Sequence, residues 1–224
     1  MTKAEYIAIE AFMLERMRDS AHDKHHVYRV LNAALDIAEG ERALDMDVLV
    51  AAALLHDIGR DEQTADPDVN HATAGGRMAY DFLTGRGWPK DKALRVQECI
   101  AAHRYRGNRP PESAEAKILF DADKLEAIGA IGMARALIYC GLVNEALYIM
   151  DDAGEIIVDG EKPISFVQEY NYKLVKVRDS LYMQKSKQIA AKRQWAALDF
   201  YSALMEEIGH NYDHGIKRLV FDDE

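Results

Sequence analysis

A histidine and an aspartate stand next to each other where the most apolar segment of the chain ends. The segment VLVAAALLHD has no polar residue before His56 and closes on Asp57. Burying an imidazole and a carboxylate without partners is costly, and a metal ion removes that cost because neutral histidine and ionised aspartate are both metal donors. Neighbours on a helix point about 100° apart, so both side chains can approach one ion. The pair predicts part of a metal site.

The remaining ligands are expected from two other helical segments. His26 lies in HDKHHVYRVLNAALDIA, and Asp123 lies in AKILFDADKLEAIGA. His22 has the i, i+4 spacing of a zinc pair with His26, but it stands at the helix start, where a solvated or capping role is expected. Asp121 lies two residues from Asp123 and therefore on another helix face, which makes it the alternative to Asp123. The expected metal ligands are His26, His56, Asp57 and Asp123.

Two further histidines stand at helix ends. His71 opens the segment HATAGGRMAYDFL, and His103 closes CIAAH. Taken singly, His71 would cap a helix and His103 would interact with a helix C-terminus. Taken with the four expected ligands, they are candidates for binding a second ion or the substrate.

Charged residues beside these ligands are candidates for binding and activating a phosphorylated substrate. Arg60 follows the HDIG turn and is the leading phosphate contact, while Asp61 and Glu62 could orient a water molecule. For substrate binding, Arg104 opens a basic loop that also holds Arg106 and Arg109. Lys124 follows Asp123, and Arg135 lies in the apolar context GMARALI. Solvated surface charge is the alternative for Arg104 and Lys124.

Helices must carry these residues, because apolar residues recur at helical spacing almost throughout and alternating strand patterns are nearly absent. The sequence predicts an all-α fold. Helices are expected over about 3–18, 23–39, 48–57, 71–84, 92–103, 112–125, 164–181 and 185–208. The polar segment 60–70 is expected to be a loop, and a short irregular or β insert is expected near 154–163.

Composition narrows the class of protein further. The net charge of −10 would repel a nucleic-acid backbone, so binding to a nucleic-acid duplex is not expected. Acidic residues interrupt the N-terminal apolar pattern, and no stretch approaches the roughly 18 apolar residues of a membrane span. Cys99 and Cys140 lie in apolar helical patterns and suit buried packing in a reducing compartment. We expect a cytoplasmic protein, monomer or homodimer, without a membrane segment.

The distributed pattern His, His-Asp, Asp resembles the HD-domain superfamily of metal-dependent phosphohydrolases. HDKHHVYRVLNAALDIA, VAAALLHDIGR, CIAAHRYRG and FDADKLEAIGAIGMARAL resemble its bacterial nucleoside triphosphate pyrophosphohydrolases, and the likeness spans about residues 20–205. It implies a single-domain HD-type helical bundle over 1–224, with a core at about 20–140 and C-terminal helices at 164–209. It also implies a divalent ion on His26, His56, Asp57 and Asp123, expected to be manganese, with magnesium, iron, zinc, cobalt or nickel as alternatives. The implied activity is release of pyrophosphate from a nucleotide.

The absence of other catalytic motifs fits this interpretation. No Gly-x-x-x-x-Gly-Lys phosphate loop and no candidate serine or cysteine nucleophile is present, and a metal ion can acidify water instead. A phosphodiesterase or nucleotidase of the same superfamily is one alternative. In the cyclic-dinucleotide phosphodiesterases a lysine usually follows HDIG, where this chain has Arg60. A di-iron oxygenase of the same superfamily is the alternative from another reaction class, and a binding protein without turnover is the third.

Overall fold

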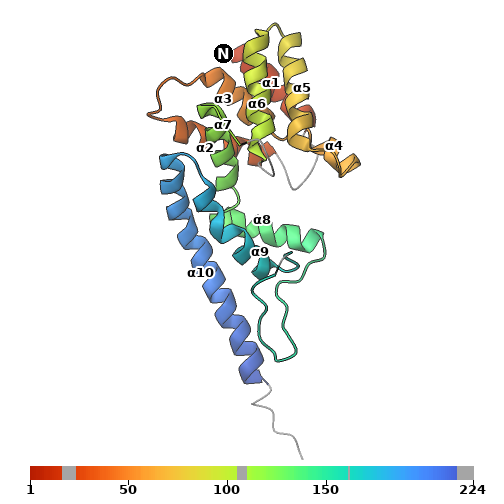
Figure 1. Ribbon diagram of the computed structural model, residues 1–224, viewed down its shortest axis with the longest axis vertical. Helices are drawn as coiled ribbons and strands as arrows, with labels where there is room; N and C mark the ends of the chain where they lie inside the picture. Colours follow the sequence, from red (N-terminus) through yellow and green to blue (C-terminus); the bar gives the residue numbers. More distant parts are fainter. Residues whose placement is uncertain (17–23, 105–109, 161, 216–224) are drawn as a thin grey trace, which may run out of the picture. The chain divides into compact units, whose positions relative to one another are not determined.

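The computed structural model describes residues 1–16, 24–104, 110–160 and 162–215, with 210–215 described by their backbone alone. These residues form helices joined by turns and irregular loops (Figure 1). No regular strand occurs among them, and the β contacts described are isolated bridges. The all-α prediction is therefore confirmed. The chain groups into two compact units, which are 1–126 with 179–188, and 127–178 with the chain from 189 onward. The single-domain organisation stays a prediction.

The first unit is built around a buried central helix, α3 (Met46–Leu55). Asp45 caps α3, because its carboxylate accepts the backbone N–H groups of Asp47 and Val48. The residues Val48, Leu49 and Ala51 to Leu55 are buried, as their uniformly apolar sequence predicts. Around α3 pack α1 (Lys3–Arg16), α2 (Lys24–Ala38), α5 (His71–Gly85), α6 (Lys90–His103) and α7 (Ala114–Leu125).

Helices α5 and α6 lie side by side and approach closely (Figure 1). A Cβ atom added at Gly76 of α5 would lie 2.9 Å from the backbone oxygen of Gln97 in α6, so only glycine fits that crossing without a shift. The short helix α4 (Arg60–Ala65) packs against α5. These contacts fix the start of α5 and the end of α6, where His71 and His103 stand.

A buried carboxylate joins segment 179–188 to the rest of the first unit. Asp121 of α7 is fully buried, and its oxygens accept the backbone N–H of Tyr182 at 2.9 and 3.1 Å and that of Met183 at 2.7 Å. These residues immediately precede α10 (Gln184–Gly215). Backbone donors at a helix start need acceptors, and Asp121 supplies them from another part of the chain. The carboxylate is thus used to hold segment 179–188 onto α7.

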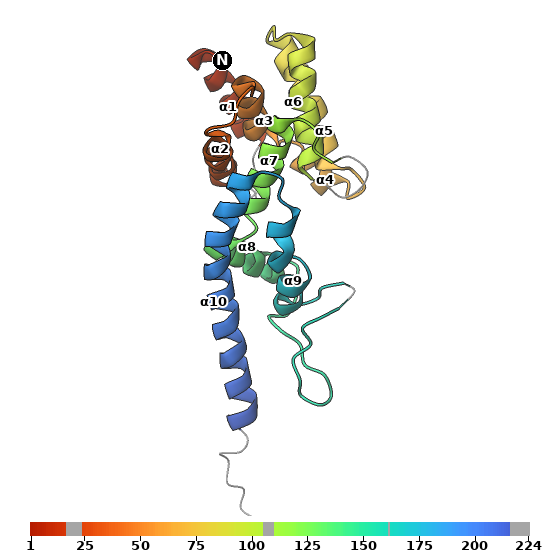
Figure 2. The same ribbon diagram turned by 60° about the vertical axis from the view of Figure 1, so that its left-hand side comes forward.

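The second unit contains α8 (Gly129–Leu142), α9 (Phe166–Tyr172), most of the 3-10 helix η1 (Leu174–Ser180) and most of α10. Tyr170 of α9 stacks on Tyr201 of α10 with ring centroids 3.9 Å apart, and Asn171 donates a hydrogen bond to the Tyr201 hydroxyl. Figure 2 shows the segment between α8 and α9 as a long loop without helices. Its described residues carry two isolated bridges, Met150 with Ile156 and Ala146 with Ser165.

Several predicted boundaries were wrong. Segment 60–70 was expected to be a loop, but residues Arg60–Ala65 form α4. Segment 164–181 was expected to be one helix, but it divides at Lys173 into α9 and η1. Helix α8 was not assigned, and α10 runs beyond the expected end at 208. Residues 17, 18 and 23 of the predicted helices lie outside the described residues.

No single helix among the described residues is long and apolar enough to cross a membrane. Two consecutive helices, Ala114–Leu125 and Gly129–Leu142, meet the length and composition criteria only when taken together, with a bend between them.

Candidate metal centre

Six side chains of the first unit converge next to α3. They come from α2 (His26), the turn after α3 (His56 and Asp57), α5 (His71), α6 (His103) and α7 (Asp123). The four histidines and Asp57 are at most 2% exposed, and the Asp123 side chain is 20% exposed. The predicted ligands His26, His56, Asp57 and Asp123 are thus together, with both further histidines beside them.

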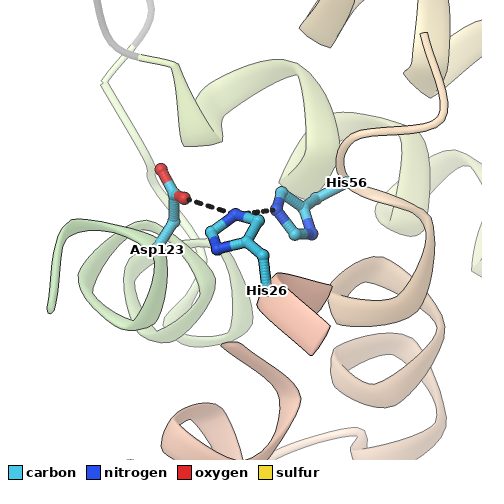
Figure 3. Close-up of side chains that lie close together, drawn as sticks. All are labelled: His26, His56 and Asp123. Atoms are coloured by element: carbon cyan, nitrogen blue, oxygen red, sulfur yellow. Dashed lines mark hydrogen bonds and ion pairs between the residues drawn. The ribbon is translucent and has the colours of Figure 1, made fainter. Parts of the chain in front are cut away.

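The first triad consists of His26, His56 and Asp123, and Figure 3 shows the His26 ring between the other two side chains. The Nε2 atom of His26 lies 3.4 Å from Nε2 of His56 and 3.5 Å from Oδ1 of Asp123. Donor atoms held about 2.1 Å from one tetrahedral ion are about 3.4 Å apart. The observed separations therefore match the edges of a metal coordination shell.

The second triad consists of Asp57, His71 and His103. Oδ1 of Asp57 lies 3.5 Å from Nε2 of His71 and 3.6 Å from Nε2 of His103, and the two Nε2 atoms are 3.3 Å apart. The other oxygen of Asp57, Oδ2, lies 3.6 Å from Nε2 of both His26 and His56. One carboxylate therefore offers an oxygen to each triad. This donor set of imidazoles and carboxylates fits one or two divalent ions.

Two of the ring orientations are fixed by backbone carbonyls. Nδ1 of His56 lies 2.8 Å from the Ala53 oxygen, and Nδ1 of His103 lies 2.6 Å from the Ile100 oxygen. A carbonyl oxygen only accepts, so each Nδ1 must carry the proton and donate it. The Nε2 lone pair of a neutral ring is then free and faces the other ligand atoms, which is the arrangement that metal binding requires.

The pKa shifts favour the same protonation states. Burial lowers the pKa of His56 to about 4 and, together with the nearby Arg60 guanidinium, that of His71 to about 2. Burial by itself would raise the pKa of Asp57, but His56, His103 and Arg60 hold it well below its usual range. The pKa of Asp123 is also held well below its usual range, because contact with His26 outweighs burial. At neutral pH these two histidines are neutral and both aspartates are ionised.

His26 is the exception. Burial alone would lower its pKa, but the carboxylates of Asp123 and Glu126 outweigh burial and raise it. A proton on His26 therefore competes with an ion for this ring.

Arg60 contacts the shared carboxylate directly. Its Nε donates to Oδ1 of Asp57 at 2.9 Å, and Nη2 donates to Oδ2 at 3.3 Å. Of the two predicted water-orienting acids, Asp61 is exposed, whereas the Oε2 atom of Glu62 is buried with no hydrogen-bond partner among the described residues. A buried acceptor without a partner is costly, so Glu62 is the better candidate for contact with water or substrate.

Two of the predicted substrate-binding cations lie beside the triads. Nη1 of Arg104 is 3.1 Å from both Nδ1 of His71 and Oε1 of Gln63. Nζ of Lys124 is 3.8 Å from Oδ2 of Asp123. Arg135 is on α8, in the second unit, so its contact with substrate stays a prediction. His22, Arg106 and Arg109 lie outside the described residues.

A close backbone approach joins the turn after α3 to the start of α5. A Cβ atom at Gly59 would lie 2.4 Å from the backbone oxygen of His71 and 2.5 Å from the backbone nitrogen of Gly75. The sequence analysis did not predict this approach at Gly59. It also missed Gln63 and Glu126, which contact ring nitrogens of ligand histidines.

Comparisons with known proteins agree with this geometry. Residues 24–128 match the HD domain family. The chain is 31% identical over 193 residues to the YpgQ protein of Bacillus subtilis, covering 84% of this chain and 85% of YpgQ. The chain belongs to the HD superfamily of hydrolases. It is accordingly a metal-dependent phosphohydrolase, as the resemblance implied.

Solved HD-superfamily structures share the fold. The structure of Bacillus subtilis YpgQ in complex with ADP has a TM-score of 0.71 and 27% identity, covering 91% of this chain and 95% of that one. An HD-superfamily hydrolase from Bacillus thuringiensis has a TM-score of 0.67 and 26% identity, covering 92% and 97%. The 3'-5' exoribonuclease YhaM of Halalkalibacterium halodurans is 25% identical over 143 residues, and this chain spans 45% of its length.

Proposed function

We propose that this enzyme hydrolyses nucleotides and releases pyrophosphate from nucleoside or deoxynucleoside triphosphates. The observation that carries the proposal is the shared carboxylate of Asp57 between two ligand triads, with the cations Arg60, Arg104 and Lys124 beside it. The likeness to YpgQ, whose solved structure contains ADP, supports a nucleotide as the substrate.

The proposed ligands of a divalent ion are His26, His56, Asp57 and Asp123, and a second ion would bind Asp57, His71 and His103. Manganese is the ion we expect. When bound, a divalent ion supplies Lewis acidity, which acidifies water and offsets phosphate charge. The four ligand histidines and Asp57 are buried and Asp123 is half-buried, so water is excluded from most of the site and electrostatic interactions there are strengthened.

The chain's own cations would bind the phosphate oxygens. Arg60 is 25% exposed at its side chain, and its planar fork already pairs with the two oxygens of Asp57. The same fork matches two phosphate oxygens, so Arg60 could contact Asp57 and the substrate in turn. Lys124 and Arg104 flank the first and second triads, respectively. We propose Glu62, rather than the exposed Asp61, as the group that orients the attacking water.

A di-iron oxygenase is the second candidate function. One carboxylate between two triads of histidine and aspartate would also suit two iron ions. This function predicts iron in the purified protein, visible colour and consumption of oxygen, and it gives no role to the phosphate-binding cations.

The experiment is a nucleotide screen on the purified full-length chain after its metal content is measured. Hydrolysis is followed with added manganese, and pyrophosphate is separated from orthophosphate. Asp57→Ala should abolish turnover while helicity is retained, because both triads lose an oxygen. Asp81→Ala, an exposed acid on α5, is the control and should keep wild-type turnover. The variants Glu62→Gln and Asp61→Asn compare the two acids in the same assay.

The reaction products distinguish pyrophosphate release from the other phosphohydrolase activities. Pyrophosphate supports the proposal, whereas cleavage of phosphodiesters or nucleoside monophosphates alone would reassign the enzyme to another phosphohydrolase activity. Full turnover by Asp57→Ala would show that the site has been misassigned.

A further inference from the structure

Each of the four ligand histidines has one ring nitrogen, Nδ1, that faces away from the triads, and the group near this atom differs among the four. His56 and His103 each face a backbone carbonyl. Nδ1 of His71 faces a neutral amide, Oε1 of Gln63 at 2.8 Å, and also the Arg104 guanidinium at 3.1 Å. Nδ1 of His26 faces a carboxylate instead, Oε2 of Glu126 at 3.6 Å.

Glu126 is held in place by a cation from the helix that carries His26. It follows α7, three residues after Asp123, and is 1% exposed. Arg29 stands three residues after His26 on α2, and its Nε donates to the same Oε2 atom at 2.6 Å. Residues three apart share a helix face, so the ligand and its supporting residue are side by side on both helices. The Glu126–Arg29 pair therefore fixes α2 against α7 directly behind the first triad.

The partner behind a ligand histidine changes how well the ring binds a cation. A carboxylate at Nδ1 fixes the ring orientation and makes the ligand nitrogen more basic. A guanidinium close to Nδ1 opposes added positive charge in a buried site, where electrostatic interactions are strong. Arg60 also lies closer to Oδ1 of Asp57, the oxygen of the second triad, than to Oδ2. Each of these effects favours an ion at the first triad.

We propose that Glu126 is a positioning residue for His26 and makes the triad of His26, His56 and Asp123 the tighter of two ion sites. The triad of Asp57, His71 and His103 then fills second, at higher metal concentration. This inference rests on the metal ligation proposed above. It adds the order in which the two sites bind their ions and names Glu126 as the residue that determines this order.

The test is a manganese titration of the full-length protein after chelation, with free Mn²⁺ followed by electron paramagnetic resonance. Wild type should bind in two phases, and His103→Ala should remove the weaker phase. Glu126→Gln should weaken the tighter phase by about 10- to 100-fold, the usual effect of removing a supporting partner, and should leave the weaker phase in place. Glu126→Asp keeps the charge and should recover part of the affinity.

The matched control is Glu115→Gln. Glu115 is another buried glutamate, 3% exposed; it lies in α7 and accepts a hydrogen bond from Nη2 of Arg95 at 2.7 Å. It lies in neither triad, so this variant can lose stability but should keep both phases.

Each outcome separates this inference from the metal proposal. If wild type binds no manganese, the proposed ligation itself fails. If wild type binds in two phases and Glu126→Gln leaves the tighter phase unchanged, or Glu115→Gln weakens it equally, the role of Glu126 is overturned and the ligation stands. Two ions of equal affinity would overturn the order of filling.

Discussion

Gly59 offers a way to disturb the second triad without removing a ligand. The residue stands two positions after Asp57. Its backbone has φ of −92° and ψ of 13°, a conformation that residues with a side chain also adopt. Replacing it with alanine therefore adds a steric problem and no backbone strain. The added Cβ would lie 2.4 Å from the backbone oxygen of His71 and 2.5 Å from the backbone nitrogen of Gly75.

The size of the disturbance follows from these distances. Both obstructing atoms belong to backbone, so no side-chain rotation relieves the overlap. Moving 2.4 Å out to an ordinary contact of 3.4 Å requires a shift of about 1 Å between the turn and the start of α5. Metal ligands tolerate deviations of only about 0.2 Å. We expect Gly59→Ala to lower the free energy of unfolding by about 1–3 kcal/mol. We also expect it to lower the affinity for the ion bound by Asp57 and His71 at least tenfold.

Urea denaturation and manganese titration of the same preparation measure the two effects. Gly85→Ala is the control, because it makes the same substitution at the last residue of α5, where an added Cβ meets no atom within 4 Å. The first triad takes two ligands from α2 and α7 and should keep its ion in both variants. Second-site affinity in Gly59→Ala equal to that of wild type would refute the reasoning.

Two further predictions concern His26 and Asp121. Because the pKa of His26 is raised, a proton on this ring competes with the ion, so manganese affinity should fall as pH drops through the raised pKa of His26. Calorimetry in buffers of different ionisation enthalpy should detect the released proton, and pH-independent affinity would contradict this. Asp121→Ala leaves two backbone donors without their acceptor and should cost about 1–3 kcal/mol in urea denaturation, with metal content unchanged. Loss of metal with unchanged stability would instead make Asp121 a ligand.

The candidate ligands could be found from the sequence because their contexts are unusual. His56 and Asp57 end an apolar run, and Asp123 interrupts another, so burial of a polar group is visible before the fold is known. The residues that contact the outward-facing ring nitrogens of the ligand histidines give no such signal. Gln63 lies in a short polar segment, and Glu126 resembles any helix-terminal acid until α2 and α7 are placed together.

The elements that were missed lack the local signals on which sequence reasoning depends. Helix α4 has six residues and no buried face, so it shows no apolar period. Helix α8 has no side-chain cap at its start, and its first residue, Gly129, has a positive φ of 74°. The segment 164–181 keeps an apolar pattern through Lys173, where the backbone departs from helical geometry. These breaks depend on packing that a linear pattern does not contain.

The chain leaves the first unit after Glu126, re-enters it at Asp179 and leaves it again after Gln188. The first two of these crossings are anchored on one helix, since α7 ends at Leu125 and its Asp121 binds the backbone of Tyr182 and Met183. A host fold that fixes the entry and exit of an insertion in this way accepts changes in the inserted segment with little cost to itself. Changes in the length or composition of residues 127–178 should therefore leave the two triads of the first unit in place.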